Sequence, residues 1–198
     1  APLIFFRLTR GDTLSDDAHY SFRSIDYVDF LSSQNQTTPL QWFGEVPGWS
    51  KLSFHDAPPL FFSVQHVFFK IFGVDTFAAR LPSSLAGVVS LILIYLLGRE
   101  LYSKQVGLVS MFILAMSSYF IWISRIAYLE GLEITFILAS LYGFVKSKTN
   151  ANYLYLWGES LGLAFLTKYT SFYLIAVYVV LILWQRRDVL KSSRIWKF

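Results

Sequence analysis

Long apolar stretches alternate with short basic clusters along the second part of the chain, after residue 82. Each stretch is somewhat shorter than the ~20 residues that a helix needs to cross a bilayer, and flanking residues or local thinning of the membrane can supply the difference. The pattern predicts an all-α, polytopic transmembrane helical protein with about five clear spans, at about 83–98, 107–123, 131–145, 153–167 and 170–185.

The last apolar stretch, 153–185, is divided into two spans because of its length. A single helix over it would be ~50 Å long, whereas two helices measure ~23 Å each, less than the ~30 Å hydrocarbon core. The turn between them, around Lys168, should therefore lie below the membrane surface. Irregular backbone at that depth is tolerated only beside protein or a wet cavity. We therefore expect Lys168 to point into a cavity that opens outward.

Three basic clusters set the expected orientation of the spans. They lie at 99–104, at 146–148 and at 186–197. Because short basic loops stay on the cytoplasmic side, all three should face inward and the turns between them outward. The ionisable residues of those outer turns and of the first 81 residues should then share one face, where we expect chemistry: Arg125, Glu130, Lys168, Asp16, Asp17, His55, Asp56 and Arg80.

The region before the spans is more polar. We interpret 1–8 as the end of a truncated first transmembrane helix, 9–81 as an outer-face loop with amphipathic helices, and 82–198 as an incomplete transmembrane bundle. Apolar residues recur every three positions from 22 to 31, which predicts an interfacial helix that begins after Ser15. A second short, half-buried helix should run from the prolines at 58 and 59 to about 72, followed by a turn over 73–80.

Composition supports a membrane protein and excludes several other classes. The chain is 55% hydrophobic and 15% charged, whereas soluble domains carry about 25% charge. Its net charge of +4 comes mostly from the expected inside loops, so it reflects orientation and predicts no nucleic-acid partner. The absence of cysteine excludes disulfides and thiolate metal sites.

Two candidate groups come from the first outer loop. Asp16 and Asp17 could act as a general base with a coupled or metal-binding partner, although acids in a first helical turn also simply favour the helix dipole. His55 and Asp56 precede two prolines, where a rigid turn with a surface ion pair is the simpler interpretation. The three histidines show no metal spacing, but a divalent cation between Asp16, Asp17 and His55 stays open. His66 is expected to be a satisfied interfacial histidine.

The outer turns supply the other candidates. Arg125 and Glu130 could form a structural clamp or part of a site, and Glu133 must be paired or face a cavity because an unpaired carboxylate in lipid is costly. Lys168 is the sharpest candidate, since a submerged lysine suits a phosphate or pyrophosphate. The alternative is a simple ion pair with Glu159 in the same hairpin.

Five short segments share a family resemblance when they are taken in order. They are Asp16-Asp17-Ala18-His19-Tyr20, then 55–62, 72–83, 124–130 and Gly162-Leu163-Ala164-Phe165-Leu166-Thr167-Lys168. This series resembles the motifs of the GT-C membrane glycosyltransferases, in particular the protein O-mannosyltransferase and aminoarabinose-transferase-like branch. Two positions depart from the pattern: Asp17 stands where Glu is usual, and Ala57 where His or Lys is usual, so a basic partner for phosphate is missing or His55 replaces it.

The resemblance implies a hexosyl or pentosyl transferase that uses a dolichyl- or undecaprenyl-phosphate sugar at the extracytoplasmic membrane face. It implies that Asp16 is the base on the acceptor hydroxyl with Asp17 beside it, and that Lys168, Arg125 and His55 hold the donor phosphate. Supporting roles would fall to Glu130, Asp56, Arg80 and Tyr20. Inverting transfer also needs, on general grounds, a base on one side of the sugar and charge stabilisation at the leaving phosphate.

Other functions stay open at this stage. A transporter or flippase-like protein that binds lipid phosphate would use the same lysine and carboxylates to line a pathway, and a non-catalytic membrane subunit is a third alternative. The expected partners are the polyprenyl-phosphate sugar, an acceptor protein or glycolipid, and membrane lipids. No cofactor is implied with certainty, and the identity of the sugar is not encoded in a recognisable motif.

Overall fold

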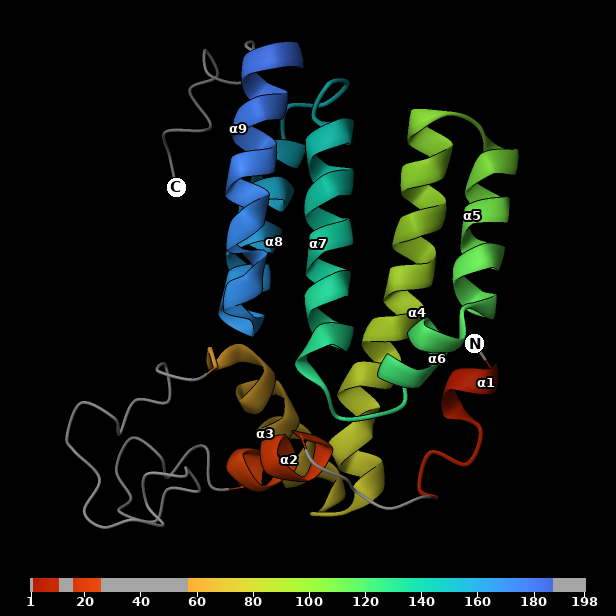
Figure 1. The fold of residues 1–198 in the computed structure, drawn as a ribbon, viewed down its shortest axis with the longest axis vertical. Helices are drawn as coiled ribbons and strands as arrows, with labels where there is room; N and C mark the ends of the chain where they lie inside the picture. Colours follow the sequence, from red (N-terminus) through yellow and green to blue (C-terminus); the bar gives the residue numbers. More distant parts are fainter. Residues whose placement is uncertain (1, 11–15, 26–56, 187–198) are drawn as a thin grey trace, which may run out of the picture.

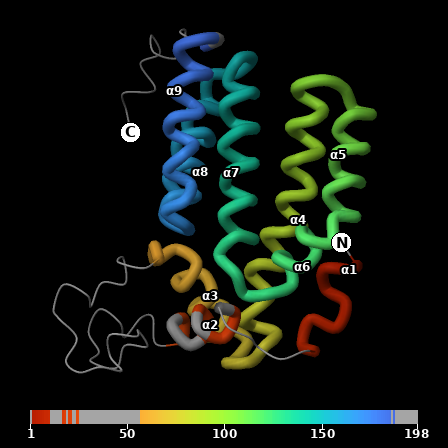
Figure 2. The backbone as a smooth tube through the Cα atoms, viewed as in Figure 1, coloured from red at the N-terminus to blue at the C-terminus, as the bar shows by residue number. Residues whose placement is uncertain are grey.

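The computed structural model describes residues 2–10, 16–25 and 57–186, and these residues form helices joined by short turns (Figure 1). Most of the longer helices stand roughly side by side, and others lie across one end of them. No strand occurs among the described residues, which confirms the prediction of an all-α fold. The path of the backbone is easiest to follow in the tube view (Figure 2).

Helix α4 (Thr76–Leu101) is the longest element and begins earlier than expected. The side chain of Asp75 caps it by accepting a hydrogen bond from the Ala78 amide at 2.7 Å, and Pro82 lies inside the helix. The prediction of a turn over 73–80 is therefore wrong beyond Asp75. The span expected from about residue 83 begins too late, because Pro82 lies inside α4 and residues 78–84 are buried.

Helices α4 and α5 (Lys104–Met116) form a tight hairpin. A Cβ atom on Gly107 would lie 2.5 Å from the Tyr95 carbonyl oxygen, and one on Gly98 would lie 2.9 Å from the Gly107 Cα. The two glycines therefore permit a backbone approach that no larger residue allows. The expected continuous span 107–123 is wrong, because α5 ends at Met116 and Ser117 caps a separate short helix, α6 (Ser118–Ile123).

The remaining helices pack as a second group. Helix α7 (Leu129–Lys146) packs between α4 and α8 (Tyr153–Thr167), and α9 (Tyr173–Gln185) follows the 3₁₀ helix η4 (Tyr169–Phe172). Aromatic side chains attach α9, since the Tyr178 ring lies 5.2 Å from Phe144 and 5.3 Å from Trp157 between centroids. The Tyr178 hydroxyl also bonds Ser140 at 2.7 Å.

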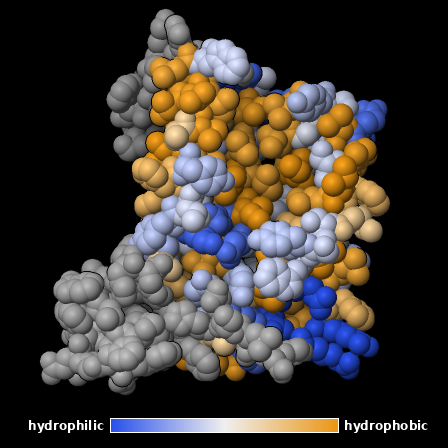
Figure 3. All heavy atoms as spheres, viewed as in Figure 1, coloured by the Kyte–Doolittle hydropathy of each residue, from blue (hydrophilic) through white to orange (hydrophobic). Residues whose placement is uncertain are grey.

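The predicted number of spans stays a prediction. Among the described residues, only α4 is long and apolar enough to cross a membrane by itself, and the other apolar helices are shorter. Many large hydrophobic side chains of α5 and α9 are nevertheless exposed, among them Phe112, Ile113, Val180 and Trp184. In the face drawn in Figure 3, hydrophobic residues cover most of the upper and middle part, while hydrophilic residues gather lower down.

The two ends of the bundle are formed by different loops and helices. The α4–α5 loop, the α7–α8 loop and the last turn of α9 lie at one end, which we call the basic end (Figure 1). Helices α2 (Asp16–Ile25), α3 (Leu60–Phe72) and α6 lie at the opposite end, together with the turn into α7, and we call it the α2–α3 end. The described basic residues of the three clusters, at 99–104, 146–148 and 186, thus share one end, as the predicted orientation requires.

A buried polar group joins α2, α3 and α4. Ser24 of α2 donates to the Gln65 side chain of α3, and the Gln65 amide donates to the Ala79 carbonyl of α4 at 2.8 Å. His66 is buried rather than interfacial: its Nδ1 lies 2.7 Å from the Ser24 carbonyl oxygen, while its Nε2 has no hydrogen-bond partner. These contacts fix α2, the expected outer-loop helix, against the start of the bundle.

Candidate functional site

Asp17 and Arg80 form a buried ion pair at the α2–α3 end. Arg80 Nη2 and Nε donate to Asp17 Oδ2 at 2.8 and 3.2 Å, and Asp17 Oδ1 accepts from the Ala127 amide at 3.0 Å. Arg80 Nη1 also donates to the carbonyls of Leu8 and Arg10, both at 3.1 Å. One ion pair therefore joins α2, α4, the α6–α7 turn and the segment after α1 (Pro2–Phe5).

This placement separates the two aspartates of the first motif. Both carboxylate oxygens of Asp17 have structural partners and the residue is 3% exposed, which favours a structural role for it. Asp16 is the first residue of α2, so the ion pair of the neighbouring Asp17 with Arg80 also fixes the backbone of Asp16. The side chain of Asp16 lies outside the described residues. His55 and Asp56 also lie outside the described residues.

Tyr20, the tyrosine of the same motif, packs among aromatic rings. Its ring makes edge or tilted contacts with Phe61 and Phe62 of α3, at centroid distances of 6.3 and 5.9 Å. It also meets Tyr128, at the start of α7, at 6.2 Å. Tyr20 thus connects the outer-loop helix to the turn that carries Arg125 and Glu130.

Lys168 forms an ion pair with Glu130 rather than with Glu159. Its Nζ lies 2.5 Å from Glu130 Oε1, with the side chains 32% and 28% exposed. Glu159 is exposed on α8, so the predicted alternative partner is wrong. Burial alone would lower the pKa of Lys168, but the hydrogen bond and charge of Glu130 outweigh it and raise that pKa above its ordinary value. Lys168 is therefore a cation at neutral pH.

Glu133 is a buried carboxylate that is stabilised by hydroxyl groups rather than by a cation. It is 6% exposed, and its Oε1 accepts hydrogen bonds from the hydroxyls of Thr170 and Ser171 at 2.8 and 2.7 Å. The 3₁₀ helix η4, which follows Lys168 directly, brings both hydroxyls to the first turns of α7. The sequence did not identify these partners, although two hydroxyl residues after Lys168 were a visible signal.

Arg125 does not form the expected clamp with Glu130. Its Nη2 donates instead to the Phe6 carbonyl oxygen at 2.7 Å, so it attaches the segment after α1 to the α6–α7 turn. Arg125 therefore lies at the same end of the bundle as Lys168 and Glu130 but belongs to a different contact. The predicted divalent site stays untested, because no metal-ligating cluster occurs among the residues described and His55 is not one of them.

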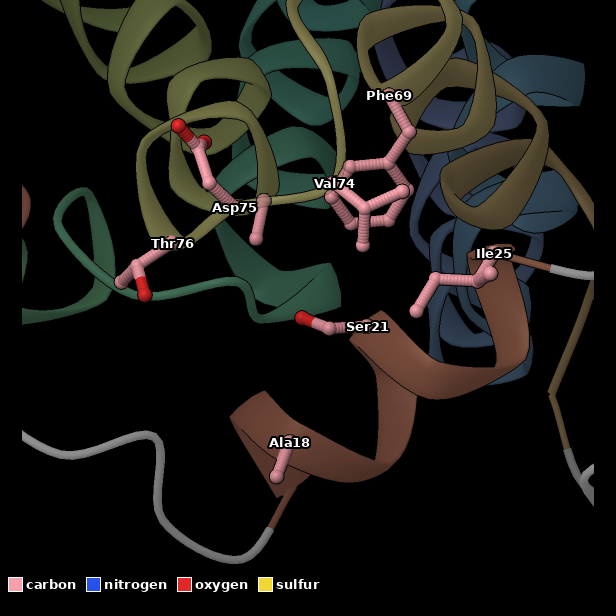
Figure 4. A pocket seen from close by; sticks show the side chains of 8 residues that line it. Ala18, Ser21, Ile25, Phe69, Val74, Asp75 and Thr76 are labelled. Carbon is pink, nitrogen blue, oxygen red and sulfur yellow. The ribbon is translucent and has the colours of Figure 1, made fainter.

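An apolar cavity of about 140 Å³ lies between α2, α3 and the start of α4 (Figure 4). Residues of α2, of α3 and of the turn into α4 line it, among them Ala18, Ser21, Ile25, Phe69, Val74 and Asp75. The Asp75 carboxylate is already used as the α4 cap. Lys168 does not line this cavity, so the outward-opening cavity expected beside Lys168 remains a prediction.

The fold resembles that of a protein of known structure. The structure of ArnT from Cupriavidus metallidurans in the apo state aligns with a TM-score of 0.70 and 18% sequence identity, over 98% of this chain and 35% of that one. At this identity the likeness establishes the fold alone. The helical arrangement is therefore ArnT-like.

Sequence comparison defines the family more closely. The family model "Dolichyl-phosphate-mannose-protein mannosyltransferase" matches residues 56–197, more than half of the chain, and the chain therefore belongs to this family. A protein of Bacillus subtilis (strain 168) named "Putative mannosyltransferase YkcB" is 27% identical over 122 residues. The aligned part is 61% of this chain and 17% of that protein, so the chain spans only a part of the relatives it matches.

Proposed function

We propose that the chain carries part of the active site of a glycosyltransferase, which moves a sugar from a polyprenyl-phosphate-linked donor to an acceptor hydroxyl at the extracytoplasmic face of a membrane. The single observation that supports this most is that α2 and the turn that carries Lys168, between α8 and η4, lie toward the same end of the bundle. Family membership supports the class of reaction. Whether the sugar is a hexose or a pentose follows from neither.

Asp16 is the proposed base. In the transfer, the acceptor oxygen forms a bond with the anomeric carbon of the sugar while the bond from that carbon to the phosphate oxygen breaks. The acceptor proton passes to the Asp16 carboxylate, and the electron pair of the broken bond stays on the leaving phosphate. The neighbouring Asp17–Arg80 pair fixes the backbone of α2, which reduces the freedom of the base.

Lys168 is the proposed partner of the donor phosphate. Its ammonium has three donors, one of which is used by Glu130, and the side chain is about one third exposed. A fixed positive charge stabilises the negative charge that develops on the leaving group. Arg125, and His55 in place of the missing basic residue at position 57, are proposed to extend this phosphate site, and Asp56 and Tyr20 to support it.

The test compares Asp16→Asn with Glu159→Gln in the membrane-inserted protein. Losing a general base should reduce sugar transfer at least ~100-fold, without reducing the amount of folded protein. Glu159→Gln removes one exposed carboxylate from α8 and should transfer at the wild-type rate. Unchanged transfer by Asp16→Asn would remove Asp16 as base, and movement of intact donor across the membrane without sugar release would favour the transporter alternative.

A further inference from the structure

The charged groups at Lys168 have a net negative charge, which does not favour binding of an anion. Glu130 contacts the Lys168 ammonium directly, and Glu133 is close enough to act on its charge, so these three groups carry a net charge of 1 − 2 = −1. The partners that Thr170 and Ser171 offer to Glu133 are neutral hydroxyls. At Lys168 itself, a phosphate therefore meets a cation that its nearest carboxylates already more than neutralise. Arg125, which we propose to extend the phosphate site, is bonded separately to the Phe6 carbonyl.

Glu130 differs from the structural carboxylate at the same end of the bundle. Asp17 uses both oxygens and is 3% exposed. Glu130 uses only Oε1, while its Oε2 is buried without a hydrogen-bond partner, and the pair with Lys168 is partly open to solvent. A half-satisfied carboxylate gains less from its position than a fully bonded one. A contribution to folding stability alone therefore does not explain well why a glutamate stands at position 130.

We propose that Glu130 opposes anion binding at Lys168, so that an anion needs a second source of binding energy to occupy the site. This inference rests on the proposed phosphate role of Lys168. A phosphate attached to a long lipid chain has that second source, because the chain lies in the membrane and raises the local concentration of the headgroup. A free phosphate has none and is kept out.

The same repulsion should help the product to leave. After sugar transfer, the phosphate that remains on the lipid has gained negative charge, so its repulsion from Glu130 is stronger than that of the donor. Removing the Glu130 charge should therefore tighten binding and slow release. A role in positioning Lys168 predicts the reverse, since loss of the ion pair would then loosen the lysine and weaken binding.

The experiment measures binding of inorganic phosphate and of a short polyprenyl phosphate to the membrane-inserted protein at neutral pH. Glu130→Gln keeps the size of the side chain and removes its charge. We expect both ligands to bind at least ~10-fold more tightly to this variant, because the repulsion acts on the phosphate itself. Turnover should fall while KM also falls, which is the pattern of slowed release.

Two control variants make the outcomes distinct. Glu159→Gln removes a carboxylate that does not contact Lys168 and should bind both ligands like the wild type. Lys168→Met should lose affinity for both ligands; if it does not, the phosphate role of Lys168, and with it the proposed function of this residue, is wrong. If Lys168→Met loses affinity but Glu130→Gln binds equally or more weakly than the wild type, the opposing role of Glu130 alone is overturned.

Discussion

The two ends of the bundle use charged residues in different ways. At the basic end, Lys146 pairs with Glu100 at 2.7 Å in a partly exposed bridge, and Arg186 donates to the carbonyl of Phe144 and the hydroxyl of Ser147, at the end of α7. At the α2–α3 end, Arg80 and Asp17 are almost fully buried and Lys168 pairs with a half-satisfied Glu130.

This difference separates anchoring from candidate chemistry. Cations at the end of a helix complement its dipole and bind free carbonyls, so the contacts of Arg186 are explained by the stability of α7. The contacts of the Arg80–Asp17 pair join four parts of the chain, which fixes α2 and the segment after α1 against the bundle. Among the described charged pairs, Lys168–Glu130 combines partial exposure with a buried carboxylate oxygen that has no partner, and it is therefore the pair best suited to bind a ligand.

The largest effect is expected when the buried pair at the α2–α3 end is broken. Arg80→Met leaves Asp17 as a buried charge without its cation, which should cost ~3–5 kcal/mol of folding free energy. Unfolding of the purified protein in detergent measures this loss. The double variant Arg80→Met with Asp17→Asn should recover part of it, because the uncompensated charge is then gone. Additive losses in the double variant would contradict direct coupling of the two side chains.

A packing change at the basic end should come next. Gly107→Ala places a Cβ 2.5 Å from the Tyr95 carbonyl oxygen, so α4 and α5 must separate, at a cost of ~1–3 kcal/mol. Gly162→Ala on α8 is the matched control, since nothing lies within 4 Å of its added Cβ. That variant should be unchanged or more stable by up to ~1 kcal/mol, from helix propensity. The same unfolding measurement compares the two variants, and equal stabilities would refute the close approach.

A change at Lys168 should affect binding more than stability. Losing a charge-assisted hydrogen bond should weaken binding of a polyprenyl phosphate to Lys168→Met by ~10–100-fold. Folding free energy should change by less than ~1 kcal/mol, because the pair is partly exposed. Titration of the ligand and an unfolding measurement on the same variant separate the two effects. A large loss of stability with unchanged binding would assign Lys168 to the same anchoring class as Arg80.

The pH dependence of this site follows from the raised pKa of Lys168. A lysine whose pKa is raised in the folded state contributes its ion pair fully below the unfolded value of about 10.4 and loses it only as the pH rises through the folded value. The charge of Lys168 should therefore persist from about pH 7 to about pH 9. Binding of a ligand with constant charge over this interval checks it, and a steep fall would mean that Lys168 is neutralised early.

The smallest effect is expected at the exposed bridge of the basic end. Glu100→Gln removes the carboxylate that pairs with Lys146, and both side chains are partly solvated. Such bridges contribute little because solvent screens the charges. Neither ligand binding nor unfolding should change measurably, and a clear effect on binding would mean that the two ends are coupled through α7.

Hydrophobic pattern and charge placement determined most of the helices. The apolar stretches after residue 82 became α4, α5, α7, α8 and α9, since a helix with apolar residues on all sides has few alternatives in lipid. The break at Ser117 was missed, because its signal is a capping hydroxyl in an otherwise apolar run. The start of α4 was also missed. Its signal is the single capping carboxylate of Asp75, whereas Pro82 in the following residues is typical of a helix boundary.

The sequence by itself thus determined the all-helical fold, the common end of the described basic residues at 99–104, 146–148 and 186, and Lys168 as an unusual cation. Only the tertiary structure decided the partners: Asp17 with Arg80, Glu130 with Lys168, and Glu133 with the hydroxyls of η4. Helix formation depends on neighbours within a few residues, so its signal is local. Ion pairs at buried positions depend on which helix ends meet, and these partners are separated by 37 to 63 residues along the chain.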